Sequence, residues 1–122
     1  MTRPRLQNYL RTYRRRFGLS QAEIGVLLGG VSGTKISRYE NFTRLPAVKA
    51  IWAFETVFNR RSHELFAGSY EPICLQVRER AKHMLAHLTA QMPERQAPRL
   101  ARKVEFLRAI AELNCDAPTA RE

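Results

Sequence analysis

The sequence predicts an all-helical fold, with a five-helix domain followed by a C-terminal two-helix extension. Apolar residues recur at spacings of three and four through most of the chain, which is the period of an amphipathic helix. No alternation of apolar and polar residues is long enough to indicate a strand. Because hydrophobic residues make up 44% of the chain, it can bury a core. We expect the five-helix domain in residues 1–69 and the extension in residues 70–122.

The first two predicted helices are marked by their ends. An apolar stripe over residues 6–17 indicates the first helix, which Gly18 ends. Ser20 and Glu23 form a capping box at the start of the second, because each side chain can accept from an orphan backbone N–H. Gly25 lies on the buried side of this second helix, where we expect it to permit the close approach of another helix.

A glycine turn separates the second predicted helix from the third. Gly29 and Gly30 end the second helix, which covers residues 20–28, since glycine is costly inside a helix. Ser32 is a favoured N-cap and predicts the third helix over residues 32–40. Two short helices joined in this way form a helix-turn-helix arrangement, whose second helix can enter the major groove of DNA.

Four further helices are predicted in the rest of the chain. One covers residues 46–58, and a short one begins at Ser62 and stops at Gly68. Two longer helices follow at residues 73–91 and 98–113, and their apolar residues form narrow seams like those of coiled coils. We expect this half of the chain to pair with a second copy, and the alternative is that it covers the core of the first domain. The residues expected at the dimer interface are Val77, Met84, Leu88, Val104 and Leu107.

Charge is distributed unevenly along the chain. The formal net charge is +10 and the isoelectric point is about 10.6, which favours a polyanionic partner, nucleic acid before membrane. Residues 1–61 carry 12 basic and three acidic residues, whereas residues 62–122 carry nine and eight. We therefore expect the polyanion site in the first half of the chain.

Several motifs together resemble a known family. The stretch GLSQAEIGVLLGGVSGTKISRYE, followed by NFTRLP, resembles the lambda-repressor-like (xenobiotic-response-element type) helix-turn-helix family over residues 6–68. Members of that family are five-helix DNA-binding domains, mostly of bacterial and phage transcriptional regulators. The resemblance implies a sequence-specific transcriptional regulator of double-stranded DNA, with repression as the expected activity and a homodimer as the expected assembly.

The resemblance also implies roles for individual residues of this chain. Positions on the exposed face of the third helix are expected to read bases, and these are Gly33, Thr34, Ser37 and Arg38. Gln21 is expected both to touch a phosphate and to brace the recognition helix. The other expected phosphate contacts are Lys35, Asn41 and Arg44, to which the basic face of the first helix adds Arg15. Arg14 and Glu40 are expected to form a structural ion pair.

The turn departs from the family pattern. The family usually has one residue where this chain has two, Gly29 and Gly30, before the Val-Ser pair. The longer turn is expected to rotate or shift the recognition helix and so to move Arg38 in the groove. Gly33 has no side chain that could read a base, so we expect it to permit close approach of its backbone to DNA.

Other reactive side chains indicate no further chemistry. Cys74 and Cys115 are far apart, and we expect them to be reduced apolar residues. Glu79, His83 and His87 share a helix face, but a solvated charged face explains them better than a metal site. We therefore expect no cofactor, no metal and no catalytic site.

The expected location and partners follow from the same observations. No apolar run is long enough for a signal peptide or a membrane span, so we expect a cytoplasmic, nucleoid-associated protein with no membrane partner. One alternative is an antitoxin or protein-binding adaptor in which residues 70–113 dock another protein. Another is an RNA-binding protein, which the lack of a motif with exposed stacking aromatics disfavours.

Overall fold

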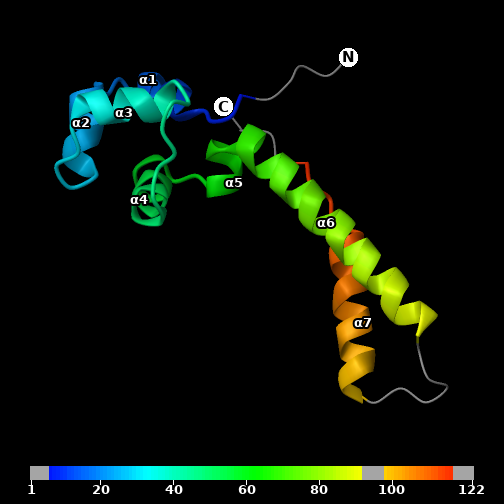
Figure 1. Cartoon of the computed structure of the whole chain (residues 1–122). Coiled ribbons are helices and arrows are strands. Elements are labelled where there is room, and N and C mark those ends of the chain that lie inside the picture. Colours follow the sequence, from blue (N-terminus) through cyan, green and yellow to red (C-terminus); the bar gives the residue numbers. More distant parts are fainter. Residues whose placement is uncertain (1–5, 92–97, 117–122) are drawn as a thin grey trace. The chain divides into compact units, whose positions relative to one another are not determined.

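The computed structural model describes residues 6–91 and 98–116, and every element in these residues is a helix (Figure 1). This confirms the predicted all-helical fold, with five helices in the first part and two longer ones after them. The chain divides into two compact units after Tyr70, and each is described by itself. The helices are α1 (Leu10–Arg16), α2 (Gln21–Leu27), α3 (Gly33–Glu40), α4 (Val48–Phe58), α5 (Ser62–Leu65), α6 (Ala67–Ala90) and α7 (Pro98–Ala111).

The first unit is held together by one apolar core. Every helix from α1 to α5 contributes to it, and α3 faces it with Ile36 and Tyr39. Tyr39 meets Phe54 of α4 edge to face, with 6.1 Å between the ring centroids. The core residues are Leu10, Tyr13, Ile24, Ile36, Tyr39, Phe54, Phe58, Leu65 and Phe66. Burial of this set fixes one face of α3 and leaves the opposite face for solvent or a partner.

Helix α1 begins four residues later than the apolar stripe predicts. The buried side chain of Asn8 donates to Tyr39 O at 2.8 Å and accepts at 3.2 Å from the N–H of Leu10, the first residue of the helix. Tyr9 N donates to Leu65 O at 2.7 Å. The residues before α1 are thus held by α3 and α5, and contacts distant in sequence override the local helical pattern.

The turn between α2 and α3 needs its glycines. The predicted capping box of Ser20 and the N-cap of α3 are both present, and Gly29 and Gly30 have φ angles of 97° and 98°. Only glycine adopts such angles readily. The expectation that Gly25 admits another helix is wrong, because a Cβ on Gly25 would collide with the carbonyl of Val31 in the turn itself.

Helix α6 begins earlier than predicted. The sequence indicated a stop at Gly68 and a new helix from residue 73, but α6 begins at Ala67 and passes through Gly68 and Pro72. A proline this close to the helix start removes one intrahelical bond, that to the carbonyl of Gly68. The N–H of Gly68 meanwhile donates to Leu6 O at 2.9 Å, so the residues that read as a break join the helix to the N-terminal segment.

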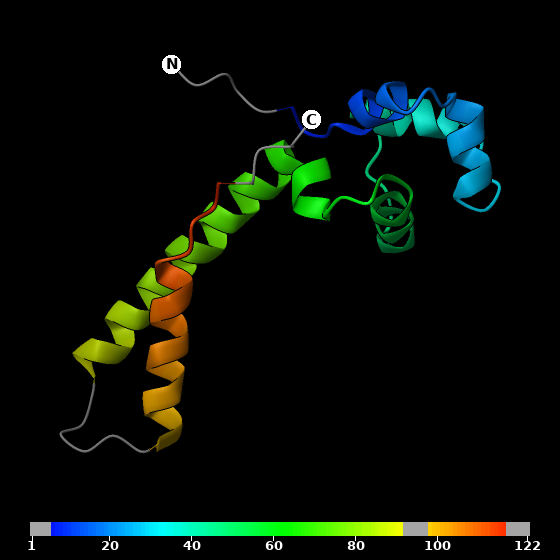
Figure 2. The same cartoon turned by 180° about the vertical axis from the view of Figure 1, so that it is seen from behind.

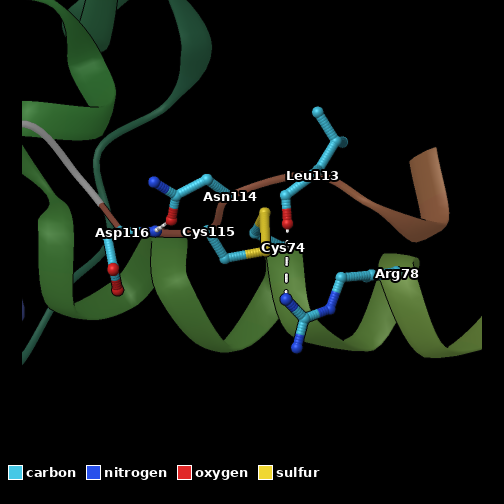
Figure 3. Close-up of a disulfide and its surroundings, with 6 residues drawn as sticks. All are labelled: Cys74, Arg78, Leu113, Asn114, Cys115 and Asp116. Atoms are coloured by element: carbon cyan, nitrogen blue, oxygen red, sulfur yellow. Dashed lines mark hydrogen bonds between the residues drawn. A yellow bond between two sulfur atoms is a disulfide. The ribbon is translucent and has the colours of Figure 1, made fainter. Parts of the chain in front are cut away.

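The second unit is a helical hairpin closed by a disulfide. Helix α7 runs back along α6 in both views (Figures 1 and 2). Cys74 and Cys115 are bonded, with 5.6 Å between their Cα atoms, and Arg78 donates to Leu113 O at 3.3 Å beside them (Figure 3). The expectation of two reduced cysteines is therefore wrong, because the segment after α7 returns to α6 and brings together residues 41 apart in the sequence.

The predicted dimerisation seam divides between the inside and the outside of this hairpin. Val104 and Leu107 of α7 are buried within it, as is Ala81 of α6. Val77 and Met84 remain 43% and 49% exposed. Leu88 is partly buried. The exposed members of the predicted seam are thus those of α6.

Candidate DNA-binding surface

Helix α3 presents two different faces. Its inner face carries Ile36, Tyr39 and Glu40, all of which are buried. Its outer face carries the residues that the sequence predicts as base-reading, of which Thr34 and Arg38 are exposed. The remaining predicted residues of this helix are partly exposed, namely Gly33, Lys35 and Ser37.

The start of α3 lies against the start of α2. A Cβ added to Gly33 would lie 3.5 Å from Ala22 N, which is an ordinary van der Waals contact. Ser32 precedes it as the N-cap and accepts from Lys35 N at 3.2 Å. The glycine at position 33 is therefore not required by the packing of α2 on α3.

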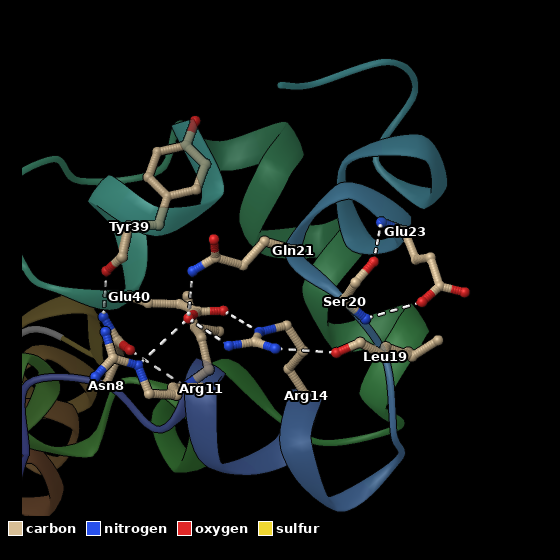
Figure 4. A network of polar contacts seen from close by, with 10 residues as sticks. Asn8, Arg11, Arg14, Leu19, Ser20, Gln21, Glu23, Tyr39 and Glu40 are labelled. Carbon is tan, nitrogen blue, oxygen red and sulfur yellow. Dashed lines mark hydrogen bonds and ion pairs between the residues drawn. The ribbon is translucent and has the colours of Figure 1, made fainter. Parts of the chain in front are cut away.

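The end of α3 is anchored by a buried polar network around Glu40 (Figure 4). Arg14 of α1 donates to both carboxylate oxygens, from Nε at 2.6 Å and from Nη2 at 3.1 Å. Arg14 also donates to Leu19 O at 3.0 Å, and Arg11 Nε lies 3.5 Å from Glu40 Oε1. One carboxylate thus joins α1 and the loop before α2 to the recognition helix.

The charge state of Glu40 follows from these contacts. Burial raises the pKa of the Glu40 carboxyl, but hydrogen bonds from Arg14 and Gln21 and the positive charge of Arg14 outweigh burial and leave that pKa below its ordinary value. The hydrogen bond to Glu40 in turn raises the pKa of Arg14. The pair is therefore ionised at neutral pH.

The side chain of Gln21 is partly buried and takes part in the network around Glu40. Its Nε2 donates to Glu40 Oε1 at 3.1 Å, which links the first residue of α2 to the last residue of α3. The structure therefore shows how Gln21 braces the recognition helix. Its phosphate contact stays a prediction.

The helices that carry this geometry lie in the part of the chain that matches a known protein family. A family model described as helix-turn-helix, of the lambda-repressor type, matches residues 10–66, which contain α1 to α5. The first unit is a lambda-repressor-like helix-turn-helix domain. Searches of curated proteins and of solved structures found no match to the chain. Domains of this family are characteristic of DNA-binding transcription regulators.

The loop after the recognition helix of the helix-turn-helix domain is built on Asn41. Its Oδ1 accepts from Thr43 N at 3.2 Å and from Thr43 Oγ1 at 2.7 Å, so the orientation of the side-chain amide is fixed. Among the described residues, Nδ2 of Asn41 has no hydrogen-bond partner and can donate to a ligand. Sequence reasoning missed Thr43, although an Asn two residues before a Thr is a signal for such a turn.

Basic side chains of the domain divide into engaged and available groups. Arg14 is committed to Glu40, and the guanidinium of Arg16 lies 5.1 Å from the centroid of the Tyr13 ring. Arg15 and Arg44 are exposed and form no ion pair within the part of the chain that the structure describes. These two exposed cations are among the residues that the sequence predicts as phosphate contacts.

In the described part of the second unit, no group of three or more His, Cys, Asp or Glu side chains is placed to hold a metal ion. Glu79, one of three residues considered as metal ligands, pairs with Lys82 at 3.1 Å. None of the described helices is both long enough and apolar enough to span a membrane.

Proposed function

We propose that the protein is a dimeric transcriptional repressor that binds a specific site in double-stranded DNA. The observation that carries the proposal is the two-faced α3 of a helix-turn-helix domain. Its inner face is fixed by the core and by Glu40, and its outer face presents Thr34 and Arg38 to solvent. A helix held in this way fits the major groove, which is about 12 Å wide.

Within this proposal, base reading falls mainly to Arg38, with Thr34 and Ser37 beside it. Arginine can donate two hydrogen bonds to guanine, which is the commonest base-specific contact in protein–DNA complexes. Gly33 has no side chain to read a base, and its proposed role is the close approach of its backbone to DNA. The longer turn of Gly29 and Gly30 then sets where in the groove Arg38 lies.

Affinity is proposed to come from the phosphates. The residues assigned to them are Gln21, Lys35, Asn41, Arg44 and Arg15. Support comes from the exposure of the last three and from the strongly basic first half of the chain. It also comes from Nδ2 of Asn41, which has no partner within the described residues. Such contacts hold the protein in register on the duplex and carry no sequence information directly. A protein with this role acts in the cytoplasm, at the nucleoid.

Dimerisation is proposed through the second unit. Ile73, Val77 and Met84 of α6 are 59%, 43% and 49% exposed, and they follow one another at spacings of four and seven residues, which places them on one helix face. Phe106 of α7 is 66% exposed. A second copy would cover these side chains and would set two recognition helices about 34 Å apart, one turn of DNA.

Selection of binding sites from random duplex DNA tests the proposal. A two-fold symmetric consensus supports both DNA reading and dimerisation. Replacing Arg38 by Ala should cost about 1–3 kcal/mol at one base pair of each half-site and relax specificity there. Equal weakening on the selected site and on random DNA would show that Arg38 contacts only phosphate.

A second candidate function uses the same exposed apolar side chains of the second unit. In this alternative the protein is an antitoxin or adaptor, and residues 70–113 dock a different protein. Light scattering separates the two candidates, because a repressor of the proposed kind is a dimer by itself. A protein that is a monomer by itself and forms a stoichiometric complex with a different protein would favour the adaptor.

A further inference from the structure

Phe42 has a backbone conformation that is unusual for its side chain. Its φ angle is 70°, and within the described residues only one other non-glycine residue, Asn59, has a positive φ. The left-handed region costs L-residues about 1–2 kcal/mol, asparagine tolerates it, and a bulky residue there is an outlier. Such a residue persists where the surrounding structure fixes it, and it is often functional.

The fold requires the left-handed backbone at position 42 but does not require a phenylalanine. Phe42 N donates to Tyr39 O at 3.3 Å, while Thr43 N and Arg44 N both donate to Arg38 O, at 3.0 and 3.2 Å. These bonds satisfy the last carbonyls of α3, and the residue that normally occupies such a position is glycine. Stability alone would therefore favour glycine at position 42.

The ring of Phe42 contributes less to the stability of the fold than a core side chain does. It is 40% exposed and is not part of the buried core of the first unit. No ring-to-ring contact of Phe42 is found in the described part of the chain. Burial of its apolar surface is smaller than for a core phenylalanine and at most offsets the cost of its backbone conformation.

The neighbours of Phe42 point to a polyanion. Asn41 precedes it with an amide donor that has no partner among the described residues, and the exposed Arg44 follows two residues later. Residues 41–54 contain two basic residues and no acidic one. Glu40, the nearest carboxylate in the sequence, is buried and neutralised by Arg14. An exposed aromatic ring in this setting fits the DNA backbone better than it fits the surface of an acidic or an apolar protein.

We infer that the ring of Phe42 packs against the deoxyribose groups of duplex DNA, between the phosphates that Asn41 and Arg44 contact. The inference rests on the proposed DNA-binding function and adds an apolar contact to it. A sugar presents C–H groups to the ring and has no charge. The contact therefore strengthens binding to any sequence and releases no counterions.

Replacement of Phe42 by glycine tests the inference. The full-length protein and the variant are titrated onto a mixed-sequence duplex of about three helical turns, at several salt concentrations, by fluorescence anisotropy. Phe42→Gly should weaken binding about tenfold, by the same factor at every salt concentration. Arg44→Ala should instead reduce the dependence of log K on log salt by about one unit. The urea midpoint of Phe42→Gly should equal or exceed that of the parent protein, because glycine suits the backbone.

Asn59→Gly is the matched control. Asn59 also ends a helix, α4, in the left-handed region, with a φ angle of 51°. This variant introduces the same backbone freedom away from the proposed contact, so its DNA affinity should equal that of the parent. Equal losses of affinity in Phe42→Gly and Asn59→Gly would overturn the inference, since glycine flexibility would then explain both.

The remaining outcomes are distinguishable. If the parent protein binds no duplex, the proposed function fails. If the parent binds and Phe42→Gly binds equally well, the DNA contact of the ring is refuted while the proposed function stands. A lower urea midpoint for Phe42→Gly together with unchanged DNA affinity would show that the ring only stabilises the fold, which overturns the inference. Unchanged DNA affinity with lost self-association would place the ring in a protein interface, which also overturns the inference.

Discussion

Replacing Glu40 by Gln should destabilise the helix-turn-helix domain more than any change at a surface carboxylate. The Glu40 side chain is 1% exposed, and that of Arg14 is 12% exposed. Four donor contacts converge on its two oxygens, at 2.6, 3.1, 3.1 and 3.5 Å. The glutamine amide keeps one acceptor oxygen but places an N–H₂ group among donors, and it leaves the Arg14 charge without its partner.

The magnitude follows from the burial of the pair. Removing one partner of a buried ion pair costs about 3–5 kcal/mol, and the partial exposure of Arg14 favours the lower end. With a urea m-value of about 1 kcal/mol/M for so small a domain, a loss of about 3 kcal/mol lowers the urea midpoint by about 3 M. Trp52, the only tryptophan, lies in α4 and reports the unfolding of this unit by its fluorescence.

Glu64→Gln is the matched control in the same unit. Glu64 faces Arg60 at 3.9 Å with i,i+4 spacing, and the two side chains are 19% and 29% exposed. Losing this pair should cost about 0.5 kcal/mol or less. Equal midpoints for Glu40→Gln and Glu64→Gln would refute the view that the Glu40 network fixes α3.

The same network predicts a pH dependence. The pKa of Glu40 is lowered in the folded protein, so the contribution of this carboxylate is complete above its unfolded pKa of about 4.3. It is lost as the pH falls through the folded pKa. The difference in stability between the parent and Glu40→Gln should thus be constant from neutral pH down to about 4.3 and shrink below it. A difference that persists undiminished at lower pH would contradict the assignment of the effect to ionised Glu40.

Three further predictions follow from individual contacts. Gly33→Ala should stabilise the domain by about 0.5 kcal/mol in urea unfolding, because the added methyl meets Ala22 at an ordinary distance, yet it should weaken DNA binding if the backbone approaches DNA closely. Tyr13→Phe should leave the urea midpoint unchanged or slightly higher, because the buried Tyr13 hydroxyl has no partner among the described residues. Cys74→Ser should lower the free energy of unfolding of the second unit by about 4 kcal/mol, because the bond to Cys115 closes a loop across 41 residues. Unfolding followed by circular dichroism measures this change. A thiol reductant should cause the same loss of stability in the parent protein and have no effect on the variant.

Features that depend on neighbours in the sequence could be predicted from it. The capping box of Ser20 and Glu23 and the N-cap at Ser32 are local hydrogen bonds, and both are present. The turn of Gly29 and Gly30 follows from a local backbone requirement, positive φ, that few other residues meet. These three signals locate the two helices and the turn between them, while the division of α3 into an inner and an outer face rests on the buried positions Ile36 and Tyr39.

Features that depend on distant contacts could not be predicted from local patterns; the ion pair of Arg14 and Glu40, 26 residues apart, was predicted only through the resemblance to the family. The start of α1 is set by the bond from Asn8 to Tyr39, 31 residues away. The disulfide of Cys74 requires the return of the chain after α7, which no local pattern indicates. In the candidate site, the resemblance implied that Gln21 braces the recognition helix, but its partner Glu40 could not be identified, since the two helices must be packed before these side chains meet.

Hydrogen bonds fasten the loop after the recognition helix to that helix, so the two are expected to move together when the longer turn shifts the helix. The carbonyl of Arg38 accepts from Thr43 N, Arg44 N and Thr43 Oγ1, at 3.0, 3.2 and 3.3 Å, so the loop is fastened to the residue proposed to read bases. Any shift that the second turn glycine imposes on α3 therefore moves the proposed base contact and the proposed phosphate contacts of this loop together. The end of α3 is meanwhile held by Glu40 to Arg14. The extra residue could then change the angle at which α3 would enter the groove under the proposed function, with Glu40 as the fixed point, without separating Arg38 from the loop proposed to bind phosphates.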